Sequence, residues 1–196
     1  MSANSKVSES LMDKYAVTRF DKICKLAEEV AEEISPFIYS DEESWYQTAL
    51  SYEMSNANIA FTKELNITQY YKNIPFEEKK VDFFIHPNKK NYSGIFLETK
   101  ANKDKNELSM STDAERGYRR QLFRYIYSSK NSSDELIKNS NYGILLFFGG
   151  SKIEDTDSFQ ESKIQKDRSG ITLELWRSAN SKRSEFELLK SFSKEI

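Results

Sequence analysis

The middle of the chain contains two short apolar stretches, 81–85 and 95–101, in which charged side chains stand among β-branched and aromatic residues. Asp82 lies in the first stretch, and Glu98 and Lys100 lie in the second. Removing an unpaired carboxylate from water costs several kcal/mol. A fold that buries these stretches must therefore bring the three charges together, or place a compensating cation beside them.

The two stretches predict a β-hairpin. Each has the length and composition of a buried strand, and residues 87–94 between them are rich in turn formers. With a loop centred near Lys90, antiparallel pairing places Asp82 opposite Glu98, with Cβ atoms about 5 Å apart. Lys100 shares their face because side chains alternate along a strand. The opposite face is expected to carry Val81, Phe83, Ile85, Ile95, Leu97 and Thr99.

Two neighbouring carboxylates repel each other unless a proton or a cation lies between them. Oxygen ligands favour a hard ion such as Mg²⁺ or Mn²⁺, which takes one or two carboxylates, a backbone carbonyl and several waters. The Lys100 ammonium can then orient an attacking water or stabilise charge on a phosphate. The pattern is compatible with metal-assisted phosphodiester hydrolysis and with a cross-strand salt-bridge cluster that has no chemistry.

Five short motifs, taken in their order along the chain, resemble those of the PD-(D/E)XK nuclease superfamily. Asp82, followed on the next strand by Glu98-Thr99-Lys100, is similar to its signature. Residues 43–50 resemble the Glu-x-x-Tyr-x-x-Ala-Leu helix of the GxxExxY branch. Residues 121–126 resemble the Gln-Leu-x-x-Tyr-Leu helix, and residues 142–148 resemble the last core strand. The motifs together span roughly half of the chain.

This resemblance implies an α/β fold with a mixed central sheet and a restriction-endonuclease-like core, in the order helix, three-stranded meander, helix, strand. It implies a site of six residues: Asp82, Glu98 and Thr99 as metal ligands, Glu43 as an additional ligand or water-holding carboxylate, Lys100 as the catalytic lysine, and Gln121 as the residue that orients the site. The implied cofactor is Mg²⁺ or Mn²⁺.

We expect the 196 residues to form one domain. The nuclease-like core is assigned to 41–150, with an N-terminal helical extension, 1–36, and a C-terminal extension, 151–196. Apolar residues at intervals of three and four predict that the N-terminal part is a long amphipathic helix, which either covers the core or forms the seam of a homodimer.

The C-terminal extension is predicted to begin with a polar loop, 151–170. Residues 171–176 alternate like a strand. The remainder, with Phe186, Leu189 and Phe192, has the spacing of a closing helix.

Charge is unevenly distributed along the chain. Residues 63–130 carry a net charge of +5, whereas residues 1–62 carry −6 and residues 131–196 carry −1. Phosphate contacts come from lysine and arginine, so a nucleic acid is expected to approach the basic third. On the helix predicted there, Arg116, Arg120 and Arg124 form a stripe opposite the apolar face, which is either a phosphate-binding surface or an ordinary solvated face.

Composition excludes several other classes. No apolar run approaches the roughly 18 residues of a membrane span, and no signal peptide is visible, so we expect an intracellular protein. The single Cys24 excludes an intramolecular disulfide and a four-cysteine iron–sulfur cluster. The leading hypothesis is a metal-dependent nuclease acting on DNA. The alternatives are an RNA endonuclease and an inactive nuclease-fold module that binds nucleic acid or a protein.

Overall fold

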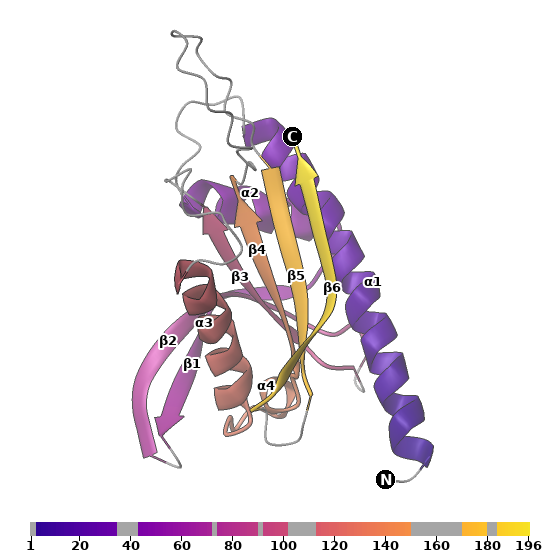
Figure 1. Cartoon of the computed structure of the whole chain (residues 1–196), viewed down its shortest axis with the longest axis vertical. Helices are drawn as coiled ribbons and strands as arrows, with labels where there is room; N and C mark the ends of the chain where they lie inside the picture. The colour runs from indigo at the N-terminus through magenta and orange to yellow at the C-terminus, as the bar shows by residue number, and fades with distance from the viewer. Residues whose placement is uncertain are drawn as a thin grey trace, which may run out of the picture.

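The computed structural model describes residues 3–34, 43–71, 74–89, 92–101, 113–149, 170–179 and 184–196. These residues form one six-stranded sheet flanked by helices (Figure 1). The strands are β1 (Phe61–Tyr71), β2 (Ile74–Ile85), β3 (Ile95–Ala101), β4 (Tyr142–Phe148), β5 (Gly170–Ser178) and β6 (Phe186–Glu195). Each strand pairs with its neighbours in sequence, so the order in the sheet is the order in the chain.

The sheet is mixed because one pair of strands, β3 and β4, runs parallel while the others run antiparallel. A parallel pair requires a crossover, and helix α3 (Asp113–Ser129) provides it. Strands β3 and β4 are central and covered on both faces, which explains the continuous apolar run of β4 and the apolar first half of β3. The α/β class and the mixed sheet predicted from the sequence are confirmed.

Helices cover both faces of the sheet. Helices α1 (Ala3–Ile34) and α2 (Glu43–Asn56) pack with one set of alternating strand residues, including Phe83, Leu97 and Ile144. Helices α3 and α4 (Glu135–Lys138) pack with the other set, which includes Phe96 and Leu145. The molecule therefore has three layers, and side-chain alternation along the strands divides its core into two halves.

The N-terminal helix α1 is a cover on the core. Ala16, Phe20, Ile23, Ala27 and Val30, which form its apolar stripe, are almost fully buried against α2 and the sheet. Because these side chains are buried within one chain, this stripe cannot be a dimer seam. Among the described helices, none combines the length and apolar character that crossing a membrane requires.

The last strand corrects a sequence-based expectation. The segment containing Phe186, Leu189 and Phe192 forms strand β6, and the predicted closing helix is wrong. The spacing of three is typical of a helix, but pairing with β5 supplies backbone hydrogen bonds that local spacing does not reveal. A register shift between Leu175 and Trp176 also interrupts the simple alternation along this pair. The predicted loop 151–170 lies almost entirely outside the described residues.

The β1–β2 hairpin changes direction next to the predicted site. Lys63 pairs with Phe83 and Leu65 pairs with Val81, but the intervening Glu64 has a positive φ of 54°. Beyond this point Val81 packs in the α3 half of the core, whereas Phe83 packs in the other half. The prediction that Val81 and Phe83 share a face is therefore wrong. The outer part of the hairpin curves towards α3 (Figure 1).

Candidate active site

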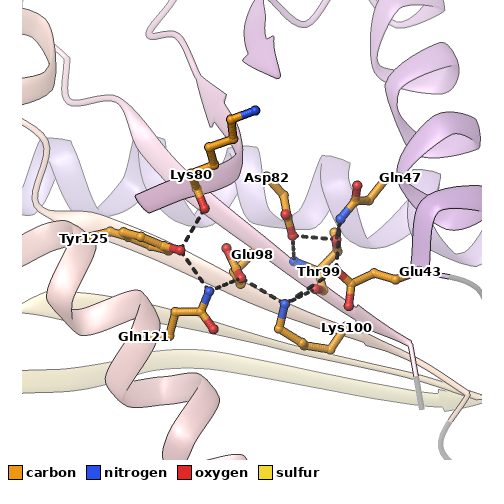
Figure 2. Close-up of polar contacts among 9 residues, drawn as sticks. All are labelled: Glu43, Gln47, Lys80, Asp82, Glu98, Thr99, Lys100, Gln121 and Tyr125. Carbon is orange, nitrogen blue, oxygen red and sulfur yellow. Dashed lines mark hydrogen bonds and ion pairs between the residues drawn. The ribbon is translucent and has the colours of Figure 1, made fainter. Parts of the chain in front are cut away.

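Strand β3 brings the Glu98 carboxylate and the Lys100 ammonium together. They lie two residues apart and share a face, as the strand alternation predicts. Lys100 Nζ donates to Glu98 Oε1 at 2.9 Å and to the Thr99 carbonyl oxygen at 2.8 Å. It also lies 3.6 Å from Glu43 Oε1, at the start of α2. Three oxygens thus surround one ammonium group (Figure 2).

The Asp82 carboxylate lies beside Thr99. Its Oδ2 accepts hydrogen bonds from the Thr99 backbone N–H and from Thr99 Oγ1, each at 2.7 Å. The β2–β3 ladder has the predicted register, with Phe83 opposite Leu97, and it ends at this pair, one residue before Asp82 and Glu98 would face each other. The Asp82 carboxylate hydrogen-bonds to Thr99 instead.

Helix α2 supplies Glu43 and a residue that the sequence analysis missed. Gln47 lies one helical turn after Glu43, and its Nε2 donates to Glu43 Oε1 at 3.1 Å and to Thr99 Oγ1 at 3.0 Å. This amide links α2 to β3. The i, i+4 spacing of Glu43 and Gln47 was the available signal, because residues four apart are neighbours on a helix.

Helix α3 brings Gln121 and a tyrosine hydroxyl to the cluster. Gln121 Nε2 donates to Glu98 Oε1 at 2.7 Å and to Tyr125 Oη at 2.8 Å. Tyr125 in turn donates to the Lys80 carbonyl oxygen on β2 at 2.8 Å (Figure 2). Tyr125 is not among the predicted site residues, because its ring fits the apolar stripe of the helix. Its position four residues after Gln121 indicates the polar contact.

The cluster shifts the pKa of three of its charged groups. The pKa of Glu98 is raised to about 7, mainly by burial and also by the nearby Asp82 charge, against the opposing effect of Lys100. The pKa of Glu43 is also raised, again mainly by burial. Burial acts to lower the pKa of Lys100, but its acidic neighbours, above all Glu98, outweigh burial and raise it. Two neighbouring carboxyl groups, those of Glu98 and Glu43, thus share the Lys100 ammonium.

The oxygens around Lys100 are of the chemical type that hard divalent ions bind. Glu98 Oε2 is buried and has no hydrogen-bond partner among the residues that the structure describes. The atoms around Lys100 Nζ are two carboxylates and a backbone carbonyl, which are the ligands that Mg²⁺ and Mn²⁺ prefer. Within the described ranges, no three or more His, Cys, Asp or Glu side chains are grouped closely enough to hold a metal by themselves.

A known family model matches most of the chain. The family model described as the PD-(D/E)XK nuclease superfamily matches residues 18–154, which is more than half of the chain. The chain belongs to the PD-(D/E)XK nuclease superfamily. The search of curated proteins and the search of solved structures found no match.

All six predicted site residues lie within the segment that matches the PD-(D/E)XK superfamily. The three-layer architecture, with its mixed sheet, is consistent with a restriction-endonuclease-like fold. Strands β5 and β6 extend the same sheet beyond the matched segment.

The arginines of α3 have different environments. Arg120 and Arg124 are exposed, whereas the Arg116 side chain lies outside the described part of the structure. Arg119, which the sequence analysis did not select, pairs with the buried Glu174 of β5 through its Nε at 2.8 Å. Arg119 therefore anchors α3 to the sheet, and Arg120 and Arg124 are the arginines that face solvent.

Proposed function

We propose that this protein is a divalent-metal-dependent nuclease that hydrolyses phosphodiester bonds, with DNA as its preferred substrate. The observation that carries this proposal is the convergence of Glu98, Glu43 and the Thr99 carbonyl on one cationic group. Beside it lies a buried carboxylate oxygen that has no hydrogen-bond partner in the described part of the chain. Membership of the nuclease superfamily supports it. We also propose that the chain belongs to the GxxExxY branch of the superfamily, because residues 43–50 and 121–126 resemble its helix motifs.

Asp82, Glu98, Glu43 and the Thr99 carbonyl would hold the ion. A bound Mg²⁺ or Mn²⁺ supplies Lewis acidity and lowers the pKa of a coordinated water. Lys100 places its ammonium next to these ligands, where it can stabilise charge that develops on a phosphate oxygen. Substrate binding and chemistry would then take place at the same end of β3.

Two amides and a hydroxyl hold these ligands in place. Gln121, supported by Tyr125, fixes the Glu98 carboxylate. Gln47 fixes Glu43 and the Thr99 hydroxyl. Such outer contacts set the geometry of ligating side chains, and their loss typically costs about 10–100-fold in metal affinity or activity.

DNA is preferred over RNA in this proposal by analogy within the superfamily, since the same site serves either substrate. The exposed Arg120 and Arg124 of α3 are assigned to phosphate contacts. The expected partner is nucleic acid, and no interaction with a membrane is expected.

The test is cleavage of linear, circular, single-stranded and branched DNA and of RNA, with Mg²⁺, with Mn²⁺ and with chelator. Cleavage that requires a divalent ion and disappears in Glu98→Gln is the expected result. Lys25→Ala, at an exposed position of α1, is the matched control, and this variant is expected to cleave as the wild-type protein does. Undiminished cleavage by Glu98→Gln would place the active site elsewhere.

A second candidate is an inactive nuclease-fold module that binds nucleic acid. One observation favours it: Lys100 already compensates Glu98 through an ion pair, so the two side chains need no ion to remain buried. Calorimetry separates the candidates. Binding of a divalent ion by the wild-type protein supports the enzyme, and its absence together with absent cleavage supports the module.

A further inference from the structure

A solvent-facing hollow of about 580 Å³ lies between helix α3 and the outer part of the β1–β2 hairpin. Three aromatic residues line it: Tyr70 from β1, Phe76 from β2 and Tyr127 from α3. Phe76 is 61% exposed, an unusual position for so large an apolar side chain. The hollow is within the size range of pockets that take small ligands or parts of larger ones.

The charge beside these rings is positive. Arg124 lines the hollow and is exposed, and Lys130 Nζ lies 3.5 Å from the centroid of the Tyr127 ring. The carboxylate in the lining, Glu77, forms an ion pair with Lys79 on the same strand. Aromatic faces next to cations are the combination that binds bases and phosphates of a single strand.

The hollow and the proposed active site lie along one seam, where α3 packs beside the β1–β2 hairpin. Gln121, Arg124 and Ser128 follow one stripe of α3, at spacings of three and four; Gln121 contacts Glu98, and the other two residues line the hollow. On β2, the segment from Asp82 to Glu77 spans roughly 16 Å at 3.3 Å per residue. A nucleic-acid strand that follows this seam from the site would reach the hollow within a few nucleotides.

We propose that this hollow binds an unpaired nucleobase of the substrate strand, with Phe76 and Tyr127 stacking on the base and Arg124 and Lys130 contacting phosphates. Bases within a duplex are stacked on each other and present no free face, so only a single-stranded segment can fill the site. The substrate class is therefore single-stranded DNA, or a duplex with a single-stranded segment beside the cleavage point. This inference rests on the proposed nuclease function.

Binding tests the inference separately from cleavage. A short single-stranded DNA that carries 2-aminopurine is titrated with protein in the presence of chelator, and a blunt duplex of the same sequence is titrated in parallel. Wild-type protein is expected to prefer the single strand and to quench the 2-aminopurine fluorescence. Phe76→Ala is expected to weaken single-strand binding by about 5–150-fold, the usual contribution of one base–aromatic stack, without weakening duplex binding.

Tyr52→Ala is the matched control, because Tyr52 is an aromatic residue of similar exposure, 65%, that lies on α2 away from the hollow. It is expected to leave both affinities unchanged. Arg124→Gln provides a second variant, which is expected to weaken single-strand binding and reduce its salt dependence. Each substitution affects an exposed side chain, so the variants are expected to fold.

Equal losses for single strand and duplex, no loss in Phe76→Ala, or no nucleic-acid binding at all would overturn the inference. The two proposals fail in different ways. Divalent-dependent cleavage with an unaffected Phe76→Ala protein leaves the nuclease and removes the base site. Loss of single-strand preference in Phe76→Ala, in a protein that cuts nothing, leaves the base site and removes the nuclease.

Discussion

Lys100 has two possible roles at the scale of a single residue, and both follow from its position. As an ion-pair partner, its ammonium compensates the buried Glu98 carboxylate and holds it in the fold. As a catalytic group, it lies where a phosphate would meet the carboxylates. Its contacts with Glu98, Glu43 and the Thr99 carbonyl show that this position suits a cation. The same contacts also mean that a divalent ion and this ammonium would compete for ligands.

This competition predicts the behaviour of Lys100→Met. The substitution is expected to abolish cleavage and to increase the affinity for Mn²⁺, because it removes a positive charge beside the ligands. Asp82→Asn is the matched contrast, expected to lower Mn²⁺ affinity because it removes a negative charge. Calorimetric titration at pH 8, where Glu98 is mainly ionised, measures both. Weaker Mn²⁺ binding by Lys100→Met would show that the lysine organises the ligands instead of competing for them.

The raised pKa of Glu98 predicts a pH dependence of stability. The folded protein retains the Glu98 proton up to about pH 7, whereas the unfolded chain loses it near pH 4.5. Between these values the folded state binds more protons, so the free energy of unfolding falls as pH rises. The loss is on the order of 3 kcal/mol for this nearly fully buried group.

Urea unfolding at pH 5 and pH 8, without divalent ions, measures this dependence. Glu98→Gln carries no titrating group at the position, so its stability is expected to fall less over the same interval. The difference between the two proteins isolates Glu98 from other groups. Equal pH dependence in both would mean that Glu98 ionises at its ordinary pKa in the folded protein.

At the scale of elements, α1 is expected to be part of the cooperative fold. Phe20 is fully buried between α1 and the sheet, and Phe20→Ala is expected to lower the free energy of unfolding by about 3–5 kcal/mol. Lys25→Ala, at an exposed position of the same helix, is expected to change it by less than about 0.5 kcal/mol. Chemical denaturation checks both, and a small effect of Phe20→Ala would indicate that α1 detaches from the core without unfolding it.

The elements that could be predicted from the sequence are those whose pattern of buried and exposed residues is regular along the whole element. Strands β3 and β4 are covered on both faces, so the apolar run at the start of β3 and along all of β4 indicated them directly. The stripe of α1 was equally clear, but periodicity alone could not show whether it packs within the chain or against a second copy. Strand β6 was missed because only its pairing with β5 distinguishes it from a helix with the same spacing.

From spacing alone, the candidate site was predictable only where its residues lie on one element and follow the spacing of that element. Glu98 and Lys100 follow from alternation on one strand, and Gln121 followed from a family resemblance. The contact of Asp82 with Thr99 lies beyond the end of the β2–β3 ladder, so strand pairing alone does not predict it. Gln47 and Tyr125 act through contacts between elements. Sequence spacing within one element does not determine such contacts.

At the scale of the whole molecule, the chain is slightly acidic, with a net charge of −2, while the segment that holds the site is basic. Overall attraction to a polyanion is therefore weak, and nucleic-acid affinity must depend on a local surface. The exposed arginines of α3 lie on that segment. Binding is then expected to be specific in orientation, with the nucleic acid directed along α3 towards the carboxylates.

This surface predicts how affinity responds to salt. The double variant Arg120→Gln/Arg124→Gln is expected to weaken DNA binding and to reduce the slope of log affinity against log salt by roughly 1.4 for single strands, about 0.7 for each lost phosphate contact. Fluorescence anisotropy over a series of salt concentrations, with chelator present to prevent cleavage, measures the slope. Lys138→Gln/Lys190→Gln is the matched control, because it removes two positive charges from side chains that are 46% and 39% exposed and that lie on α4 and β6. If both double variants reduce the slope equally, net charge governs binding and the arginine surface has no special role.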